Sequence, residues 1–75
     1  MAIASIIVEI EDNAMEQVLP ALGKVPGISV FGVKENQIVT VIEGETLGSV
    51  NELIKKLSEF ERVTGVYPVY ARANE

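Results

Sequence analysis

Apolar residues alternate with polar or mixed positions at the start of the chain. Residues 3–10 are rich in β-branched side chains, and one alternate set within them is uniformly apolar. A period of two with such enrichment predicts a strand whose apolar side faces the core. That core set consists of Ala4, Ile6, Val8 and Ile10. The other side of this strand then carries Ile3, Ser5, Ile7 and Glu9.

The next segment has apolar residues at helical spacing, which predicts a helix with one buried side. These residues are Met15, Val18, Leu19 and Leu22. Asn13, with Glu16 three positions later, predicts a capping box at the start of the helix. Pro20 lies inside the pattern and lacks a backbone donor, so it predicts a kink or a short helix.

A second helical stripe covers residues 47–57. Its apolar positions are Leu47, Val50, Leu53, Ile54 and Leu57. Thr46 or Ser49 is expected to cap this helix, and Glu52 completes a capping box with Ser49. A last strand is expected from Val66 to Tyr70. It contains Pro68, which cannot donate a ladder hydrogen bond, so this strand should lie at a sheet edge.

Residues 28–33 and 37–43 are predicted to be two strands of a hairpin. If Glu35-Asn36 is a two-residue loop, Asn36 is the residue expected to take the left-handed conformation. The expected cross-strand pairs are Val33 with Ile38, Phe31 with Thr40, and Ser29 with Ile42. The core side of the hairpin would collect Ile28, Val30, Val39 and Val41. A slip of one residue would exchange the two faces of a strand.

The order strand, helix, strand, strand, helix, strand predicts an α+β fold. Two β-α-β halves joined by a hairpin form the ferredoxin-like βαββαβ sandwich. Its antiparallel sheet has the order 4-1-3-2, and both helices cover one face. Residues 1–75 are expected to be one domain, since a second would leave neither half enough apolar area to fold.

The sheet face without helices is expected to be unusually apolar. A solvated face normally has a polar residue at every second position, but here the polar positions are only Ser5, Glu9, Ser29 and Thr40. The apolar positions assigned to this face are Ile3, Ile7, Phe31, Val33, Ile38, Ile42, Tyr67 and Val69. Glu9 and Glu43 mark its opposite ends with negative charge. Such a patch predicts a covering partner, either a second copy or another chain that offers apolar side chains and arginine.

Composition narrows the classes of function. The chain has no Cys and no His, so thiolate and imidazole chemistry are excluded. Eleven acidic residues outnumber six scattered basic ones, which argues against nucleic-acid binding. The six glycines match no phosphate-binding loop. We therefore expect a binding module that is not an enzyme and has no metal or cofactor.

The apolar run at the N-terminus bears on location. A membrane span needs about 20 apolar residues, and this run is far shorter because Ser5 and Glu9 interrupt it. It also lacks the basic flank of a secretory signal. We expect no membrane insertion and a cytoplasmic location.

Four segments in this order resemble the NapD family, small cytoplasmic chaperones of periplasmic nitrate reductase maturation. They are Ile3-Ala4-Ser5-Ile6-Ile7-Val8, Val25-Pro26-Gly27-Ile28-Ser29-Val30, Gln37-Ile38-Val39-Thr40-Val41-Ile42-Glu43 and Val63-Thr64-Gly65-Val66. Order and spacing carry the resemblance, because each segment alone is mostly strand-forming. The chain departs from the family at Ser29, where many members have glutamate. It departs again at residues 69–73, where the family has a hydrophobic pair and Tyr-His, so the last strand is expected to be altered or shorter.

The resemblance implies binding to the twin-arginine signal peptide of the nitrate reductase catalytic subunit NapA, which is held back from export while the molybdenum cofactor is inserted. Family positions carry over to Ser5, Ile7, Ile42 and Glu43. With the bare sheet face, the full set of expected peptide-binding residues is Ser5, Ile7, Glu9, Phe31, Thr40, Ile42, Glu43 and Tyr67.

Two alternatives stay open. One is an Lrp/AsnC-type effector-binding (RAM-like) domain, and the other is an ACT-like small-molecule-binding domain; both dimerise. Lrp/AsnC-type domains carry Gly-x-Tyr-Asp before the third strand, where this chain has Glu35-Asn36-Gln37-Ile38. In these alternatives, a second copy of the chain would cover the bare sheet face and form a weak homodimer.

Overall fold

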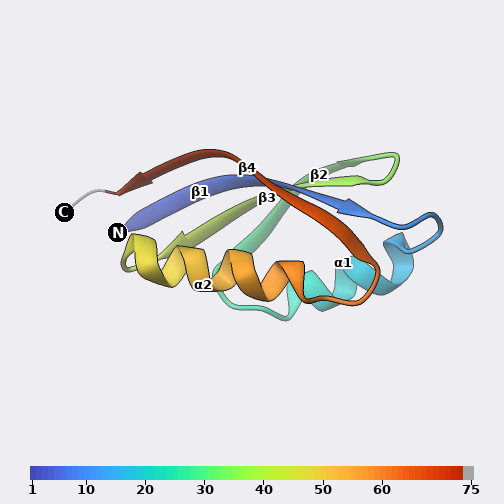
Figure 1. Cartoon of the computed structure of the whole chain (residues 1–75), viewed down its shortest axis with the longest axis horizontal. Helices are drawn as coiled ribbons and strands as arrows, with labels where there is room; N and C mark the ends of the chain where they lie inside the picture. The colour runs from blue at the N-terminus through green and yellow to red at the C-terminus, as the bar shows by residue number, and fades with distance from the viewer. Residues whose placement is uncertain (74–75) are drawn as a thin grey trace.

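The alternation at the N-terminus forms strand β1 (Ala2–Ile10), whose residues are alternately buried and half-buried along its whole length. The computed structural model describes residues 1–73. The other elements are α1 (Met15–Gly23), β2 (Ile28–Lys34), β3 (Gln37–Gly44), α2 (Leu47–Ser58) and β4 (Val63–Ala73). Both helices lie on the same side of the sheet (Figure 1). The predicted α+β fold with βαββαβ order is confirmed.

The four strands form one antiparallel sheet in the order β2-β3-β1-β4, which is the predicted order read from the other edge. β4 is an edge strand, as Pro68 required. It has 11 residues against nine in β1. Register shifts beside Ser5/Ile6 and Glu9/Ile10 accommodate the extra residues. β4 runs from Val63 to Ala73 and is therefore longer than the predicted segment 66–70.

The β2–β3 hairpin has the predicted two-residue loop, since Lys34 pairs with Gln37 and Val33 with Ile38. The left-handed residue is Glu35, with φ 54°, and not Asn36 as expected. A bulge between Val30 and Gly32 then shifts the register by one residue. The observed pairs are Val30 with Thr40 and Ile28 with Ile42, so the predicted pairs of Phe31 with Thr40 and Ser29 with Ile42 were wrong.

The face assigned to β3 was also wrong. Side chains directly opposite each other in a sheet share a face, and the core side of β1 pairs with the even-numbered residues of β3. Ile38, Thr40 and Ile42 are therefore fully buried beneath the helices, and Val39 and Val41 lie on the other face. Val33 follows Ile38 to the helix side.

A buried hydroxyl is accommodated at Thr40 by one hydrogen bond. Its Oγ1 donates to the carbonyl oxygen of Ile6 at 3.0 Å. A buried polar group with a partner avoids the penalty of an unsatisfied one. Two of the predicted site residues, Thr40 and Ile42, thus belong to the core.

Of the two helix caps predicted, the one for α1 is absent and the one for α2 is present. α1 begins after Ala14 without a side-chain cap, and Asn13 takes a left-handed φ of 62°, so the first capping box was wrong. Pro20 lies inside this helix, which is short, with nine residues, as expected. In α2 the cap is Thr46, whose side chain accepts from the Ser49 amide at 3.1 Å. The helices complete the core with Val18, Leu22, Val50 and Leu57.

Gly27 sets the close approach of β2 to β3. Its φ is 91°, and a methyl group added there would come within 2.7 Å of the Glu43 carbonyl oxygen. The Glu43 amide donates to the Gly27 carbonyl at 2.8 Å. This backbone contact requires a residue without a side chain.

Candidate functional site

The candidate site is the sheet face that carries no helix, which we call the open face. Its β1 residues alternate with the buried ones, and their cross-strand partners share the same face. Strand pairing arranges these residues in four rows across the sheet, counted from the β2–β3 hairpin. Row one is Lys34, Gln37, Glu9 and Gly65; row two is Gly32, Val39, Ile7 and Tyr67. Row three is Ser29, Val41, Ser5 and Tyr70; row four is Glu43, Ile3 and Arg72.

The two middle rows carry the accessible apolar side chains of the open face, and row three also contains Ser5 and Ser29. Val39 is 43% exposed, Tyr67 51% and Tyr70 54%, although all three lie in paired strands. Ile7 lies between Val39 and Tyr67 and is half-buried by them. Contiguous apolar surface on a small domain marks a site that another molecule covers. The middle of the open face therefore has the character of a docking surface.

Tyr67 orients a carboxylate at the end of these rows. A methyl group added at Gly65 would lie within 2.7 Å of the Tyr67 ring, so the ring lies over the glycine. Gly65 is opposite Glu9, and the Tyr67 hydroxyl donates to Glu9 Oε1 at 3.4 Å. The absence of a side chain at Gly65 thus lets the Tyr67 hydroxyl reach the Glu9 carboxylate.

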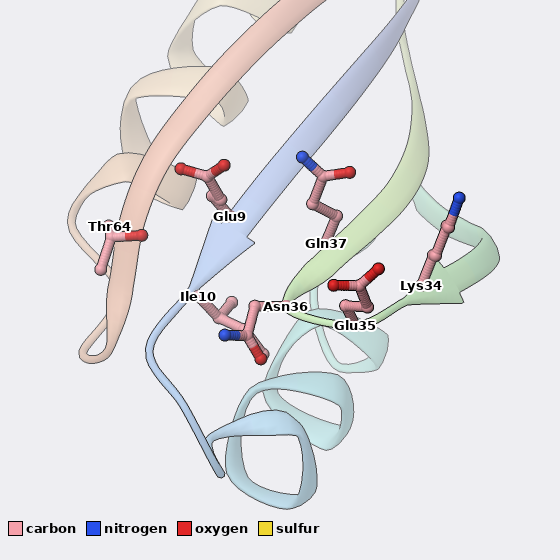
Figure 2. A pocket seen from close by; sticks show the side chains of 7 residues that line it. All are labelled: Glu9, Ile10, Lys34, Glu35, Asn36, Gln37 and Thr64. Atoms are coloured by element: carbon pink, nitrogen blue, oxygen red, sulfur yellow. The ribbon is translucent and has the colours of Figure 1, made fainter.

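A hollow of about 490 Å³ opens beside Glu9 at the hairpin end. Its lining consists of Glu9, Ile10, Lys34, Glu35, Asn36, Gln37 and Thr64. Figure 2 shows Glu9 and Gln37 rising from neighbouring strands on the same side of the sheet. Two carboxylates and one ammonium group give this lining a formal charge of −1. We call it the hairpin hollow.

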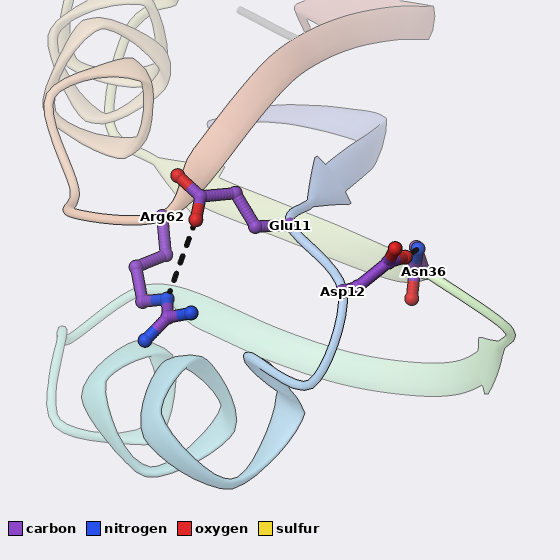
Figure 3. A network of polar contacts seen from close by, with 4 residues as sticks. All are labelled: Glu11, Asp12, Asn36 and Arg62. Atoms are coloured by element: carbon purple, nitrogen blue, oxygen red, sulfur yellow. Dashed lines mark hydrogen bonds and ion pairs between the residues drawn. The ribbon is translucent and has the colours of Figure 1, made fainter.

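Polar contacts join the three loops behind the hairpin hollow. Arg62 forms an ion pair with Glu11 at 3.6 Å, and the Asn36 side-chain amide donates to the Asp12 carboxylate (Figure 3). The Ile10 amide also donates to the Asn36 carbonyl at 2.9 Å. The left-handed residues other than glycine lie one in each loop: Asn13, Glu35 and Arg62. These contacts hold the hairpin tip and the loop that follows α2 each against the loop that follows β1.

The opposite end of the open face has a different lining. A hollow of about 320 Å³ lies there, lined by Met1, Glu43, Gly44 and Glu45. Met1 is 72% exposed and supplies apolar surface. Arg72 lies in row four, opposite Ile3. This end therefore combines apolar surface with charges of both signs, whereas polar side chains dominate the hairpin hollow.

Five of the eight predicted site residues lie on the open face, and they are Ser5, Ile7, Glu9, Glu43 and Tyr67. Phe31 is 72% exposed, but it occupies the β2 bulge and has no partner in the ladder. Thr40 and Ile42 lie beneath the helices and not on the open face, so these two predictions were wrong.

Sequence reasoning missed Val39, Val41 and Tyr70, which form much of the two middle rows. A signal for the β3 pair was present, since the polar residues Gln37 and Glu43 share their alternation. Side chains of one alternation share one face. The polar hydroxyl of Thr40 led to the prediction that Thr40 and its alternate neighbours face the solvent. Its buried hydrogen bond to Ile6 could not be predicted from the sequence.

Two further features of residues 1–73 bear on the site. Within this range, no group of three or more His, Cys, Asp or Glu residues is arranged to hold a metal ion. Across the same residues, neither helix has the length and apolar character needed to cross a membrane.

Comparison with known protein families identifies a relationship. A family model described as NapD protein matches residues 1–75, which is the whole chain. The match includes the segments 3–8, 25–30, 37–43 and 63–66, on which the resemblance in the sequence rests. No curated protein matches the chain.

Proposed function

The chain belongs to the NapD family, which has a role in nitrate reductase maturation, and from this premise we propose that it binds the twin-arginine signal peptide of the catalytic subunit NapA on its open face. The resemblance seen in the sequence is thereby confirmed at the level of the family. The family is one of chaperones and not of enzymes. In the proposed function, the protein acts in the cytoplasm and retains the peptide until the cofactor has been inserted.

The observation that carries this proposal is the set of exposed apolar side chains in the middle of the open face, namely Val39, Tyr67 and Tyr70. A signal peptide of this class combines an apolar segment with an arginine pair. The apolar segment would cover Val39, Ile7 and Tyr67, removing their exposed surface from water. The arginines would pair with carboxylates at the ends of the face, because a guanidinium group binds a carboxylate through two hydrogen bonds.

Charge favours a basic peptide over a second copy of the chain. Each copy has a formal net charge of −5. Stacking two open faces would bring Glu9 and Glu43 of both copies to one interface, where like charges repel. Arginine residues of a peptide would instead neutralise these groups. The proposed partner is therefore the peptide, bound by a single copy.

Isothermal titration calorimetry with a synthetic twin-arginine peptide tests this function. The unmodified protein should release or absorb heat on binding, and replacing both arginines of the peptide by lysine should weaken binding because lysine forms no bidentate pair. Val39→Asp should weaken binding at least about tenfold, since it places a charge within the apolar contact.

Leu47→Asp is the matched control for Val39→Asp. Leu47 is also 43% exposed but lies at the first position of α2, away from the open face, and an acidic residue suits the first turn of a helix. Binding should be unchanged in Leu47→Asp, and circular dichroism should show both variants folded. No binding by the unmodified protein, or equal losses in the two variants, would contradict the proposal.

Sizing by light scattering separates peptide binding from self-association. We expect a single copy in the free protein and a complex of one copy with one peptide. A stable dimer that dissociates when Val39→Asp is introduced, and that excludes the peptide, would show that the open face is a contact between copies.

A further inference from the structure

The two ends of the open face differ in chemistry, and we infer that a bound peptide lies on it in one direction, with its arginine pair at the hairpin hollow and its apolar segment running toward row four. In this arrangement Glu9 is the acceptor for a guanidinium group. The inference rests on the proposed function and adds to it the polarity of the bound chain and the residue that recognises arginine.

The volume of the hairpin hollow and the hydrogen-bond acceptors at its edge suit an arginine side chain. Its volume of about 490 Å³ lies within the range of roughly 300–1,000 Å³ that is usual for small-ligand sites. Glu9 and Gln37 are directly opposite each other in row one, and their carboxylate and side-chain amide rise on the same side of the sheet at the edge of the hollow (Figure 2). The guanidinium group of arginine has five N–H donors in a planar fork, which can bind the carboxylate of Glu9 and the amide oxygen of Gln37 together.

Glu9 differs from Glu43 in burial and in support. Glu9 is half-buried on a central strand, and Tyr67 donates to its carboxylate. Glu43 is exposed at the far end of the face. Partly buried charges are screened less by salt than exposed ones. The Tyr67 hydroxyl also offers the Glu9 carboxylate a weak hydrogen bond, at 3.4 Å. Glu9 is therefore the stronger site for a guanidinium group.

The apolar rows continue directly from Glu9. Ile7 is two residues away on the same face, a distance of about 7 Å along the strand. The face then extends to Ile3, about 20 Å from Glu9, and beyond it to the exposed side chain of Met1. A peptide whose arginines lie over row one would thus place its following apolar residues on rows two and three.

Cationic side chains do not distinguish the two ends of the face, because Arg72 and Lys34 each lie on an edge strand with one residue between them and the carboxylate of their row. The ends differ in their carboxylates, since Glu43 is exposed whereas Glu9 is half-buried. Met1 further favours an apolar segment at the far end.

Paramagnetic NMR on the complex tests the direction. A nitroxide label placed before the arginine pair of the peptide should broaden the amide signals of residues 34–37 and 64–65, and leave those of Ile3 and Glu43 sharp. A label after the apolar segment should give the reverse pattern. Broadening of both ends by each label, or the opposite assignment, would overturn the inference and leave peptide binding intact. Absence of any complex would overturn both the inference and the proposed function.

Glu9→Gln and Glu43→Gln form a matched pair that tests the acceptor. Each removes one carboxylate from the open face with little change in shape. Glu9→Gln should reduce the preference for the twin-arginine peptide over its twin-lysine form at least about tenfold, and Glu43→Gln should leave that preference within about twofold. Equal effects, or a larger effect of Glu43→Gln, would overturn the role given to Glu9.

Discussion

Both faces of β3 have apolar residues in the middle of the strand, yet the molecule uses them differently. Ile38, Thr40 and Ile42 are fully buried under the helices, whereas Val39, on the other side of the same strand, is 43% exposed. The buried side even contains the only hydroxyl of the strand, bonded to Ile6. For the middle of this strand, where both sides are apolar, coverage by the helices decides which side belongs to the core.

This difference separates stability from recognition. Side chains of the covered face contact both β1 and the helices, so their removal leaves a cavity. Side chains of the open face keep part of their surface in water and lose less when they are shortened. Residues such as Val39 can therefore contact a binding partner, while the buried residues stabilise the fold. Each of the following substitutions tests this division, in order of decreasing effect on the free energy of unfolding.

Ile42→Ala is expected to have the largest effect, a loss of about 2–5 kcal/mol, because it empties space in a fully buried site. Ile3→Ala is its counterpart, since Ile3 lies on the neighbouring strand at the same end but on the open face and is only half-buried. Ile3→Ala should lower the free energy of unfolding by about 1 kcal/mol. Urea unfolding measures both, and equal losses would show that the open face is structurally as important as the core.

Gly27→Ala should destabilise the protein by about 1–3 kcal/mol. A residue with a side chain is strained at φ 91°, and the methyl group would come within 2.7 Å of the Glu43 carbonyl oxygen. Gly23→Ala is the control, because nothing lies within 4 Å of a methyl group there. It should be neutral or stabilise by up to about 1 kcal/mol. If thermal unfolding showed similar effects for both, the contact of Gly27 would not set the position of β2.

Thr40→Val should lower the free energy of unfolding by about 1 kcal/mol, since it removes the hydrogen bond to Ile6 while keeping the shape of the side chain. Ser5→Ala removes a hydroxyl from the open face and should change it by less than about 0.5 kcal/mol. A gain in stability for Thr40→Val would mean that the buried hydroxyl is tolerated without a net benefit.

Tyr67→Phe should have the smallest effect on stability, less than about 0.5 kcal/mol, because its 3.4 Å bond to Glu9 is exposed. The ring stays over Gly65, so the fold is unchanged. The amide signals of Glu9 and Gly65 in NMR spectra should nevertheless shift, since the carboxylate loses its donor. Unchanged spectra would show that Tyr67 does not orient Glu9.

Much of the architecture could be predicted from local patterns. The alternation in residues 3–10 identified the central strand and its core side, and Pro68 placed the last strand at an edge. The two-residue loop at Glu35-Asn36 was also correct. These features depend on residues close together in the chain, or on the absence of a backbone donor in proline, so periodicity is sufficient to find them.

The sequence by itself determined the order of elements, the family and the existence of an apolar open face with a carboxylate at each end. Only the tertiary structure decided which β3 residues form that face, where the hairpin hollow lies and how Tyr67 reaches Glu9 across Gly65. The physical reason is that a strand with two apolar sides fits either way locally. Its orientation is selected by pairing with β1, a contact between distant parts of the chain, and the bulge near Phe31 then sets the register of β2 against it.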